Sequence, residues 1–459
     1  MSAVKNALPT PDVYYHQGGK DFYLRNDRDF WIAVNEAAVK RHLKIQGYSA
    51  EKFTTEPVSL LDQCLNTIQT KQDVNYAAPL AGYDAGIYEI NNRRILVTDS
   101  PRLIQSKEGE WPLLEQIFEG MLNDPACDQR PYFYGWLKTA LSALHSKKWQ
   151  PGQVLAMAGP VASAKSLCQS LITEMLGGRS AQPYQFMCGA TTFNADLFVA
   201  EHLTVEDVAE SVGIAKRRAF GAQIKAFAVN REQHCHGKNQ QALTLTPIWR
   251  VTISLNDDPE RLLVLPPMDD DIADKVMLFK VTKKAMPMPT GTSDEIDAFW
   301  KALQAELPAF QHYIENWEIP EDLRSPRFGI LHYHHPELLE ALNALSPEMQ
   351  LLEMIDKELF DYAYTEVKPW PGTAASLHAR LTEQDSKVRK QADTLLYSPV
   401  ACGTYLARLV TKHPDRVTKR RINGQTRYTI VGPQSELNTV ATGGTVVVEK
   451  QLLSNSEDV

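Results

Sequence analysis

Residues 154–166 read VLAMAGPVASAKS, an apolar run followed by a loop of small residues, a lysine and a serine. The apolar run Val154–Met157 predicts a buried strand, and the apolar spacing from Lys165 to Leu176 predicts an amphipathic helix. A strand, a loop and a helix in this order form the setting in which a loop holds phosphate groups. The stretch therefore predicts an α/β fold built on a phosphate-binding loop.

The loop itself predicts that the chain binds ATP and Mg²⁺. Backbone N–H groups of such a loop surround a triphosphate, and the positive end of the following helix adds to the attraction. Lys165 is expected to reach the β- and γ-phosphates, and the Ser166 hydroxyl to hold Mg²⁺. Ala164 departs from G-x-x-x-x-G-K-[ST], which has glycine before the lysine, and places a methyl group where main chain and ligand approach closely. The expected nucleotide-binding residues are Gly159, Pro160, Val161, Ala162, Ser163, Ala164, Lys165 and Ser166.

The sequence after the loop alternates between strand-like and helical stretches. We expect strands at Leu197–Val199, Val251–Leu255 and Met277–Val281, and a long helical region from Val205 to Phe227. A parallel sheet flanked by helices is the economical outcome of such alternation.

An ATP-driven motor needs an acidic residue at the end of a strand beside the phosphate loop, to hold Mg²⁺ and polarise water. Glu201 follows the apolar run Leu197–Ala200, so we interpret it as this catalytic and Mg²⁺-binding acid. The next residue is His202, where many such ATPases carry a second acid, which leaves Glu206 and Asp207 as substitutes for the catalytic base. A solvated carboxylate at the end of a strand is the alternative interpretation of Glu201.

A third motif is the apolar run Trp249–Leu255, which ends in Asn256. Phosphate loop, acid-ended strand and Asn-ended strand together resemble the superfamily-three helicases of viruses, phages and plasmids, a branch of the AAA+ ATPases. The similarity is greatest to the helicase part of phage and plasmid primase-helicases, and it spans roughly Tyr132 to Lys284. It implies that Asn256 is a catalytic sensor of the γ-phosphate, whereas an ordinary Asn that starts a turn is the alternative.

The same resemblance implies a hairpin that faces the pore of a ring and touches DNA. Lys225, Arg231 and Lys238 belong to the matching stretch, although a solvated lysine is an equally ordinary interpretation of Lys238. Metal binding at His234, Cys235 and His236 is disfavoured, because adjacent side chains of a strand point to opposite faces.

Assembly into a ring, a hexamer, is also implied by the resemblance, because family members complete the active site with an arginine from the neighbouring subunit. The usual place of this arginine holds Asp274 and Lys275 here, and lysine lacks the planar fork of a guanidinium group. The sequence does not choose among the remaining candidates, which are Arg217, Arg218, Arg250 and Arg261.

Basic residues gather near the C-terminus. Helices expected to begin at Thr373, Lys387 and Pro399 precede a hairpin around Asn423-Gly424, a pattern that suggests a winged helix. The helix would enter a groove of duplex DNA while cations of the wing contact phosphates, whereas a solvated basic face is the alternative. The basic residues are Arg408, Lys412, Arg416 and Arg427, with Lys419, Arg420 and Arg421 as the nucleic-acid contacts we expect.

A chain of 459 residues is too long for one hydrophobic core, so several domains are expected. We predict an N-terminal mixed α+β or helical domain (1–125), an ATPase core of the AAA+ type (126–285), a helical region (286–370), a winged-helix-like domain (371–435) and a mobile tail (436–459). Six cysteines without C-x-x-C spacing, and a start without a signal peptide or membrane span, favour a cytoplasmic protein.

The leading hypothesis is an ATP-dependent helicase or translocase of phage or mobile-element replication, with single-stranded DNA in its pore. A net charge of −8 argues against this unless basic residues cluster locally, as they do near the C-terminus. The second hypothesis is a weakened ATPase that serves as a nucleotide-gated DNA-binding or loading factor, because Ala164 and His202 depart from the usual pattern. A small-molecule P-loop kinase is the third.

Overall fold

The computed structural model describes residues 11–52, 57–125, 127–206, 214–238, 241–360 and 368–433. Asp207, Asn239 and the tail predicted at 436–459 lie outside these ranges. The chain divides into two compact units between Asn343 and Ala344, and each is described by itself.

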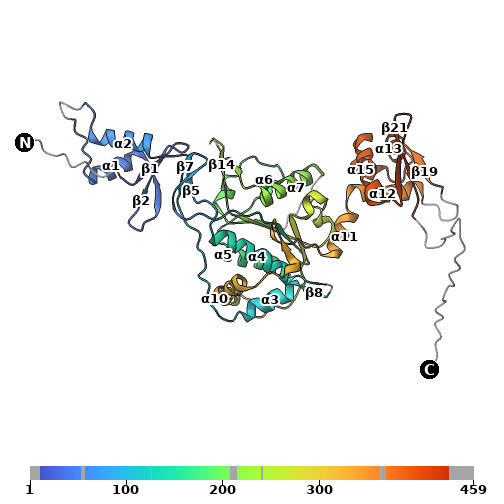
Figure 1. Ribbon diagram of the computed structural model, residues 1–459, viewed down its shortest axis with the longest axis horizontal. Coiled ribbons are helices and arrows are strands. Elements are labelled where there is room, and N and C mark those ends of the chain that lie inside the picture. Colours follow the sequence, from blue (N-terminus) through green and yellow to red (C-terminus); the bar gives the residue numbers. More distant parts are fainter. Residues whose placement is uncertain are drawn as a thin grey trace, which may run out of the picture. The chain divides into compact units, whose positions relative to one another are not determined.

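The centre of the first unit is a parallel sheet, which confirms the expected α/β class (Figure 1). β10 is buried along its whole length because it is apolar on both faces, as is typical of a central parallel strand. The sheet has five described strands, in the order β11 (Ser180–Ala181), β12 (His202–Val205), β15 (Arg250–Leu255), β10 (Val154–Ala158) and β16 (Val276–Lys280).

Helices cover both faces of this sheet. On one face, Leu155 and Met157 of β10 pack with helices that come both before and after β10 in the chain. These helices are α3 (Pro112–Leu122), α4 (Arg130–His145), α5 (Lys165–Met175) and α10 (Ser293–Asn316). On the other face, Val154 and Ala156 pack against α7 (Ile214–Val229), beside which lies α6 (Tyr184–Met187) (Figure 1).

Two element predictions in this sheet are wrong. Leu197–Val199, expected as a strand, belongs to the 3-10 helix η1 (Ala195–Val199), and the strand is β12, which begins at His202. A short apolar run has no periodicity that separates a strand from a buried helical turn, so the sequence placed this strand too early. The helix expected from Val205 to Phe227 cannot include Val205, which ends β12, and its described part is α7 (Ile214–Val229).

The N-terminal part of the first unit contains two small sheets. The first has the strand order β3-β2-β1-β4 and carries helices α1 (Glu36–Ile45) and α2 (Leu60–Lys71); the second has the order β5-β7-β6. The strands are β1 (Val13–His16), β2 (Asp21–Arg25), β3 (Trp31–Val34), β4 (Asp73–Val74), β5 (Tyr76–Ala78), β6 (Gly86–Ile90) and β7 (Arg93–Val97).

Smaller elements complete the first unit. The antiparallel hairpin of β13 (Gln233–Cys235) and β14 (Leu243–Leu245) lies between α7 and β15 in the sequence. The other elements are β8 (Asn123–Asp124), β9 (Cys127–Asp128), α8 (Pro259–Leu262), α9 (Asp270–Ala273), η2 (Glu321–Leu323), β17 (Arg324–Ser325), β18 (Gly329–Ile330) and α11 (Pro336–Ala344).

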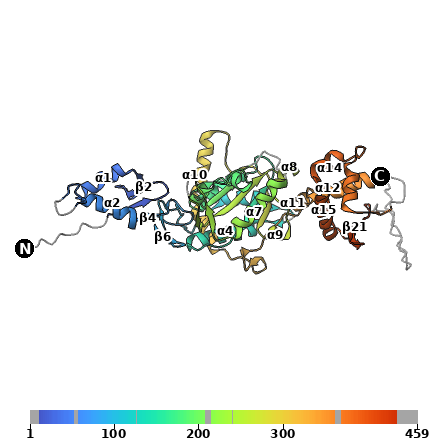
Figure 2. The ribbon, with the colours of Figure 1, turned by 90° about the horizontal axis from the view of Figure 1, so that it is seen from above.

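In its described residues, the second unit combines four helices with a three-stranded antiparallel sheet of order β19-β21-β20 (Figure 2). Three of the helices and the hairpin lie where the sequence predicts them. The elements are α12 (Pro347–Leu359), β19 (Trp370–Gly372), α13 (Ala374–Thr382), α14 (Arg389–Leu395), α15 (Pro399–Lys412), β20 (Val417–Ile422) and β21 (Gln425–Ile430).

Candidate functional site

The phosphate-loop sequence connects β10 to α5 at the carboxyl edge of the parallel sheet. Ala158 pairs with Leu255, and the N–H of Gly159 donates to the Leu255 carbonyl at 3.2 Å, so the loop leaves the sheet beside the end of β15. Gly159 packs closely: a Cβ atom there would lie 2.2 Å from the carbonyl oxygen of Val281. Glycine is therefore required at the start of the loop for steric reasons.

The loop turns sharply before α5 begins. Ala162 and Ala164 have φ angles of 61° and 63°, in the left-handed region that favours glycine. Ala164 is the N-cap of α5 but has no side-chain group able to cap it, and the first helical hydrogen bond runs from Cys168 N–H to Ala164 O. The amides ahead of Cys168 thus belong to the helix turn that lacks intrahelical acceptors, which is suited to an anion.

Lys165 folds back over this loop. Its Nζ donates to the carbonyl oxygens of Gly159 and Pro160, both at 2.7 Å, and lies 3.2 Å from Ser163 Oγ. Ser166, in the first turn of α5, is exposed. The loop and the first turn of α5 therefore carry an ammonium group, an exposed hydroxyl group and helix-terminal amides.

Asn256 belongs to the same edge of the sheet. It directly follows β15, and the pairing of Ala158 with Leu255 places it level with Gly159 on the adjacent strand. The structure therefore brings Asn256 beside the loop, at partial exposure.

Glu201 is at the opposite edge, so its expected position beside the loop is wrong. It precedes β12, and its neighbour His202 pairs with Arg250, the first residue of β15. The side chain is 1% exposed and forms an ion pair with Arg179; its Oε1 also accepts from the N–H of Gly82 at 2.8 Å. Glu201 therefore precedes its strand instead of following it, and it is a buried structural partner of Arg179.

Glu206 occupies the position that the sequence assigned to Glu201. It follows Val205, the last residue of β12, and Val205 pairs with Ile253 in the carboxyl half of β15. Glu206 is exposed. Parallel strands end at the same edge, so Glu206 joins the edge that holds Gly159 and Asn256. The sequence signal was an acid after the β-branched and apolar stretch Leu203–Val205.

His202, whose place in the motif raised doubt about the catalytic base, is a buried structural residue. Its ring nitrogens lie 2.7 Å from Thr173 Oγ1 and 2.8 Å from Thr252 Oγ1. Gln169 Nε2 donates to the same Thr252 oxygen at 2.9 Å. Burial lowers the pKa of His202 to about 3, so the ring is neutral in the fold and joins α5 to β12 and β15.

Lys280 is a charged residue of the carboxyl edge that the sequence analysis missed. It ends β16 opposite Ala158, and its Nζ lies 2.5 Å from Glu337 Oε2 and 3.9 Å from Asp124 Oδ2. The hydrogen bond that Lys280 donates to Glu337, together with the charges of the nearby carboxylates, raises the pKa of Lys280. A lysine at the end of a fully apolar strand was the available signal.

The stretch that the resemblance matches to a pore hairpin contains the antiparallel pair β13–β14. Asn194, on the loop before η1, holds it: its Nδ2 donates to His234 O and its Oδ1 accepts from His236 N–H, both at 2.8 Å. Arg231 and Lys238 lie on this segment and are exposed.

Lys225 is separate from the hairpin. It lies on α7 and pairs with Asp271 of α9. Its positive charge is therefore largely neutralised within the fold, which weakens the expectation that it meets nucleic acid.

The three residues considered for metal binding diverge. Cys235 is buried and burial raises its pKa to about 12, whereas His234 is exposed on the same strand. In the part of the chain that the structure describes, no three His, Cys, Asp or Glu side chains form a group suited to a metal ion.

Two of the four candidate arginines are buried and bonded internally. Arg217 donates to Leu265 O through Nε and Nη2, and Arg250 donates to Trp249 O through Nη1. Burial lowers the pKa of both, that of Arg250 to about 10. Arg218 is exposed, and Arg261 is partly exposed.

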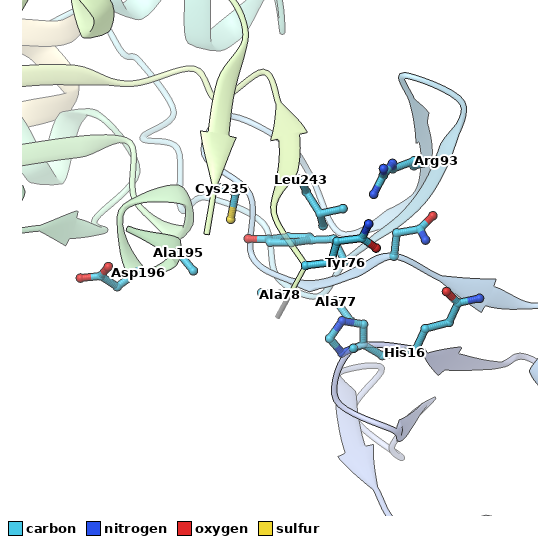
Figure 3. A pocket seen from close by; sticks show the side chains of 13 residues that line it. His16, Tyr76, Ala77, Ala78, Arg93, Ala195, Asp196, Cys235 and Leu243 are labelled. Carbon is cyan, nitrogen blue, oxygen red and sulfur yellow. The ribbon is translucent and has the colours of Figure 1, made fainter. Parts of the chain in front are cut away.

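A cavity of about 560 Å³ lies apart from the loop, between N-terminal strands and the β13–β14 hairpin (Figure 3). None of its lining residues belongs to Gly159–Ser166. It is lined by His16, Gln17, Gly18, Asn75, Tyr76, Ala77, Ala78, Arg93, Ala195, Asp196, Cys235, Gln241 and Leu243.

In the second unit, the basic residues divide into two groups. Arg408 and Lys412 of α15 lie 3.4 and 2.7 Å from the buried Glu348, and Arg416 pairs with Asp356 at 2.5 Å. The expected contacts Lys419, Arg420 and Arg421 lie on β20 and are exposed, as is Arg427 on β21.

The fold is similar to that of the NrS-1 C terminal region. Its apo structure (305-718) has a TM-score of 0.52 and 10% identity, covering 92% of this chain and 96% of that chain. The A form apo structure gives 0.51 and 9% over the same shares. SCCmec type IV Cch, an active helicase, is more distant, with a TM-score of 0.30, 8% identity and coverage of 88% and 73%, and adds no argument.

No family model and no curated protein matches this sequence. The likeness to the NrS-1 region therefore concerns the fold alone. Within the described residues, no helix is long and apolar enough to cross a membrane.

Proposed function

We propose that this chain binds ATP with Mg²⁺ on the loop Gly159–Ser166 and couples its hydrolysis to movement along nucleic acid, as a helicase or translocase. The observation that carries the proposal is the convergence of Lys165, Asn256 and Glu206 at one edge of a parallel sheet. These are the groups that a phosphate-transferring site requires: a cation for the phosphates, a polar sensor and an acid.

Each residue has a defined task in this site. Lys165 leaves the loop carbonyls to pair with the β- and γ-phosphates, while the helix-terminal amides hold their oxygens. Glu206 accepts a hydrogen bond from the attacking water and orients it, and Asn256 donates its amide to the γ-phosphate. The Ser166 hydroxyl and either Glu206 or Asp207 would hold Mg²⁺, which would neutralise the phosphate charge.

Nucleic acid is the substrate that the remaining features favour. The β13–β14 hairpin is held to the core by Asn194, so a movement of the core would reach it, and the exposed Arg231 and Lys238 flank its first strand at opposite ends. From the resemblance we infer a hexameric ring, with single-stranded DNA in its pore at this hairpin. A replication role in a phage or mobile element is inferred from the same resemblance.

A second candidate function is a nucleotide-gated DNA-binding or loading factor with weak hydrolysis. The left-handed backbone of Ala164 supports it, because a side chain at this conformation is strained by about 1–2 kcal/mol relative to glycine and crowds the phosphates. The other reason for expecting weak hydrolysis was His202 in place of an acid. That reason no longer applies if Glu206 is the catalytic acid.

The test is ATP turnover of the purified chain with and without single-stranded DNA, compared between wild type and Lys165→Ala. We expect stimulated turnover that the variant loses, while Lys301→Ala on the exposed side of α10 retains it. ATP binding without stimulated turnover in the wild type would favour the loading factor. Equal turnover in the Lys165 variant would exclude the site, and phosphorylation of nucleosides by a monomer would support the kinase.

A further inference from the structure

The hairpin β20–β21 carries a positive charge that the second unit does not balance. Residues 417–433 contain no Asp or Glu, but they contain four exposed cations: Lys419, Arg420, Arg421 and Arg427. Among the described residues, no carboxylate lies within ion-pair distance of these four. The hairpin is therefore a concentrated basic surface.

The strand register brings two of these cations together. Arg420 and Arg427 are directly opposite in the antiparallel pair, and Thr418 and Thr429 are the next opposite pair on the same face. Like charges that face each other across a sheet destabilise it, and an anion between them removes the repulsion. Two guanidinium groups beside two hydroxyl groups suit phosphate oxygens, which guanidinium groups bind with paired hydrogen bonds.

The basic residues of α15, by contrast, hold the second unit together. Glu348 of α12 is fully buried and accepts from Lys412 at 2.7 Å and Arg408 at 3.4 Å. Burial raises the pKa of Glu348, but the hydrogen bond and charge of Lys412, with the charge of Arg408, outweigh it and lower the pKa overall. Both cations are thus committed to a buried carboxylate.

The remaining outer surface of α15 is poorly equipped to read bases. Its exposed positions include Pro399, Val400, Thr404 and Thr411, and Val400 is 77% exposed. Discrimination between base pairs in the major groove rests mainly on paired hydrogen bonds from Arg, Lys, Asn or Gln. The helix offers none of these side chains unpaired at those positions.

The hairpin also lacks the means to bind single strands by stacking. Its one aromatic residue, Tyr428, is buried, and its hydroxyl group donates to Gly403 O at 3.4 Å. Sequence-tolerant binding of single strands depends on exposed aromatic rings on which bases stack. The cations and their spacing are suited instead to the densely charged backbone of a duplex.

We propose that the second unit binds duplex nucleic acid through the phosphate backbone with the β20–β21 hairpin, and that α15 does not read the base sequence. This corrects the expected division of tasks between helix and wing. It rests on the proposed function only for the choice of nucleic acid as the polyanion. The single-stranded contact at the β13–β14 hairpin would be a separate one.

The experiment measures binding of the full chain, without nucleotide, to two duplexes of equal length and unrelated sequence at several salt concentrations. In Arg420→Ala/Arg427→Ala, we expect the slope of log affinity against log salt to become shallower by about 0.9, because the two guanidinium groups hold one phosphate between them and each phosphate contact contributes about 0.9. Both duplexes should lose affinity equally. Arg420→Lys/Arg427→Lys should retain most of the slope.

The matched controls are Arg389→Ala and Lys390→Ala, which remove exposed cations of α14 outside the hairpin and should leave the slope unchanged. An unchanged slope in the hairpin variant would overturn the proposal. A preference of the wild type for one duplex that Thr404→Ala abolishes would also overturn it. So would a hairpin variant that loses affinity only for single-stranded DNA, or only for an acidic peptide used as competitor. Because ATP turnover is measured separately, a chain without turnover can still pass this test.

Discussion

The carboxylate of Glu201 accepts a hydrogen bond from Arg179 Nε at 2.9 Å, inside the first unit and at the amino ends of its parallel strands. The loop Gly159–Ser166 follows the carboxyl end of β10. The length of the sheet therefore separates this ion pair from the proposed nucleotide site. The pair connects Arg179, just before β11, to Gly82 through the same carboxylate.

Glu201→Gln is expected to destabilise the fold without affecting catalysis. The amide retains the shape of the side chain but leaves the Arg179 guanidinium, mostly buried, with only the exposed Asp99 at 3.8 Å as a counter-charge. Breaking a buried pair from one side costs about 3–5 kcal/mol in the free energy of unfolding. Urea unfolding should show this loss, while ATP turnover per folded molecule stays at the wild-type value. Lost turnover at unchanged stability would show that Glu201 takes part in catalysis.

Glu206→Gln should have the opposite profile. The amide cannot take up or direct a proton as the carboxylate does, so turnover should fall by about 10²–10⁴-fold. ATP binding, measured by titration of a fluorescent analogue, should remain, because the loop amides and Lys165 are intact. Glu201→Gln is the matched control, since it removes the same charge at the other end of β12. Full activity in the Glu206 variant would refute the assignment.

Ala164→Gly tests the departure from the usual loop sequence. Its φ of 63° costs alanine about 1–2 kcal/mol, whereas glycine adopts this angle without strain. Glycine is in turn less favourable by about 0.5–1 kcal/mol, because it loses more conformational entropy than alanine on folding. We expect the free energy of unfolding to stay the same or rise by about 1 kcal/mol, and ATP affinity to rise or stay unchanged. Ala164→Val, β-branched at a left-handed position, should weaken both. Tighter ATP binding by wild type than by the glycine variant would show that the methyl group assists.

His202 makes stability dependent on pH. Its pKa is about 3 in the fold and about 6.5 in the unfolded chain, so the unfolded state binds the additional proton between these values. The stabilising contribution is complete above about pH 6.5 and declines as pH falls toward 3. Between pH 7.5 and 5.5 the loss should be about 1 kcal/mol.

His202→Gln provides the comparison for this effect, because glutamine can bond to Thr173 and Thr252 but does not titrate. The free energy of unfolding of this variant should fall less over the same pH interval than that of wild type. Parallel curves would mean that His202 titrates normally in the fold.

Asn194→Ala should loosen the β13–β14 hairpin. The side chain satisfies His234 O and His236 N–H, and leaving buried polar groups unpaired costs about 1–3 kcal/mol. We expect faster hydrogen exchange at the hairpin amides and weaker single-stranded DNA binding, with ATP affinity unchanged. Asn316→Ala at the exposed end of α10 is the control. Equal exchange rates in both variants would show that the hairpin is held by other contacts.

The sequence was sufficient for features that depend on near neighbours along the chain. The strand, loop and helix around Lys165 follow from an apolar run, small residues and helical periodicity, and the structure has them at those positions. The strand before Asn256 and the hairpin at Asn423-Gly424 were also correctly placed. The roles of Lys165, Ser166 and Asn256 in nucleotide chemistry stay predictions.

Features that depend on which segments meet across the fold needed the three-dimensional arrangement. Glu201 and Glu206 both border short apolar runs, and only the pairing of Val205 with Ile253 shows which of them reaches the carboxyl edge of the sheet. Likewise, Arg408 and Arg420 both look like surface cations in the sequence, yet one meets the buried Glu348 on α12 and the other faces Arg427. Charge is a property of a residue, but its availability depends on the groups that folding places within a few ångströms of it.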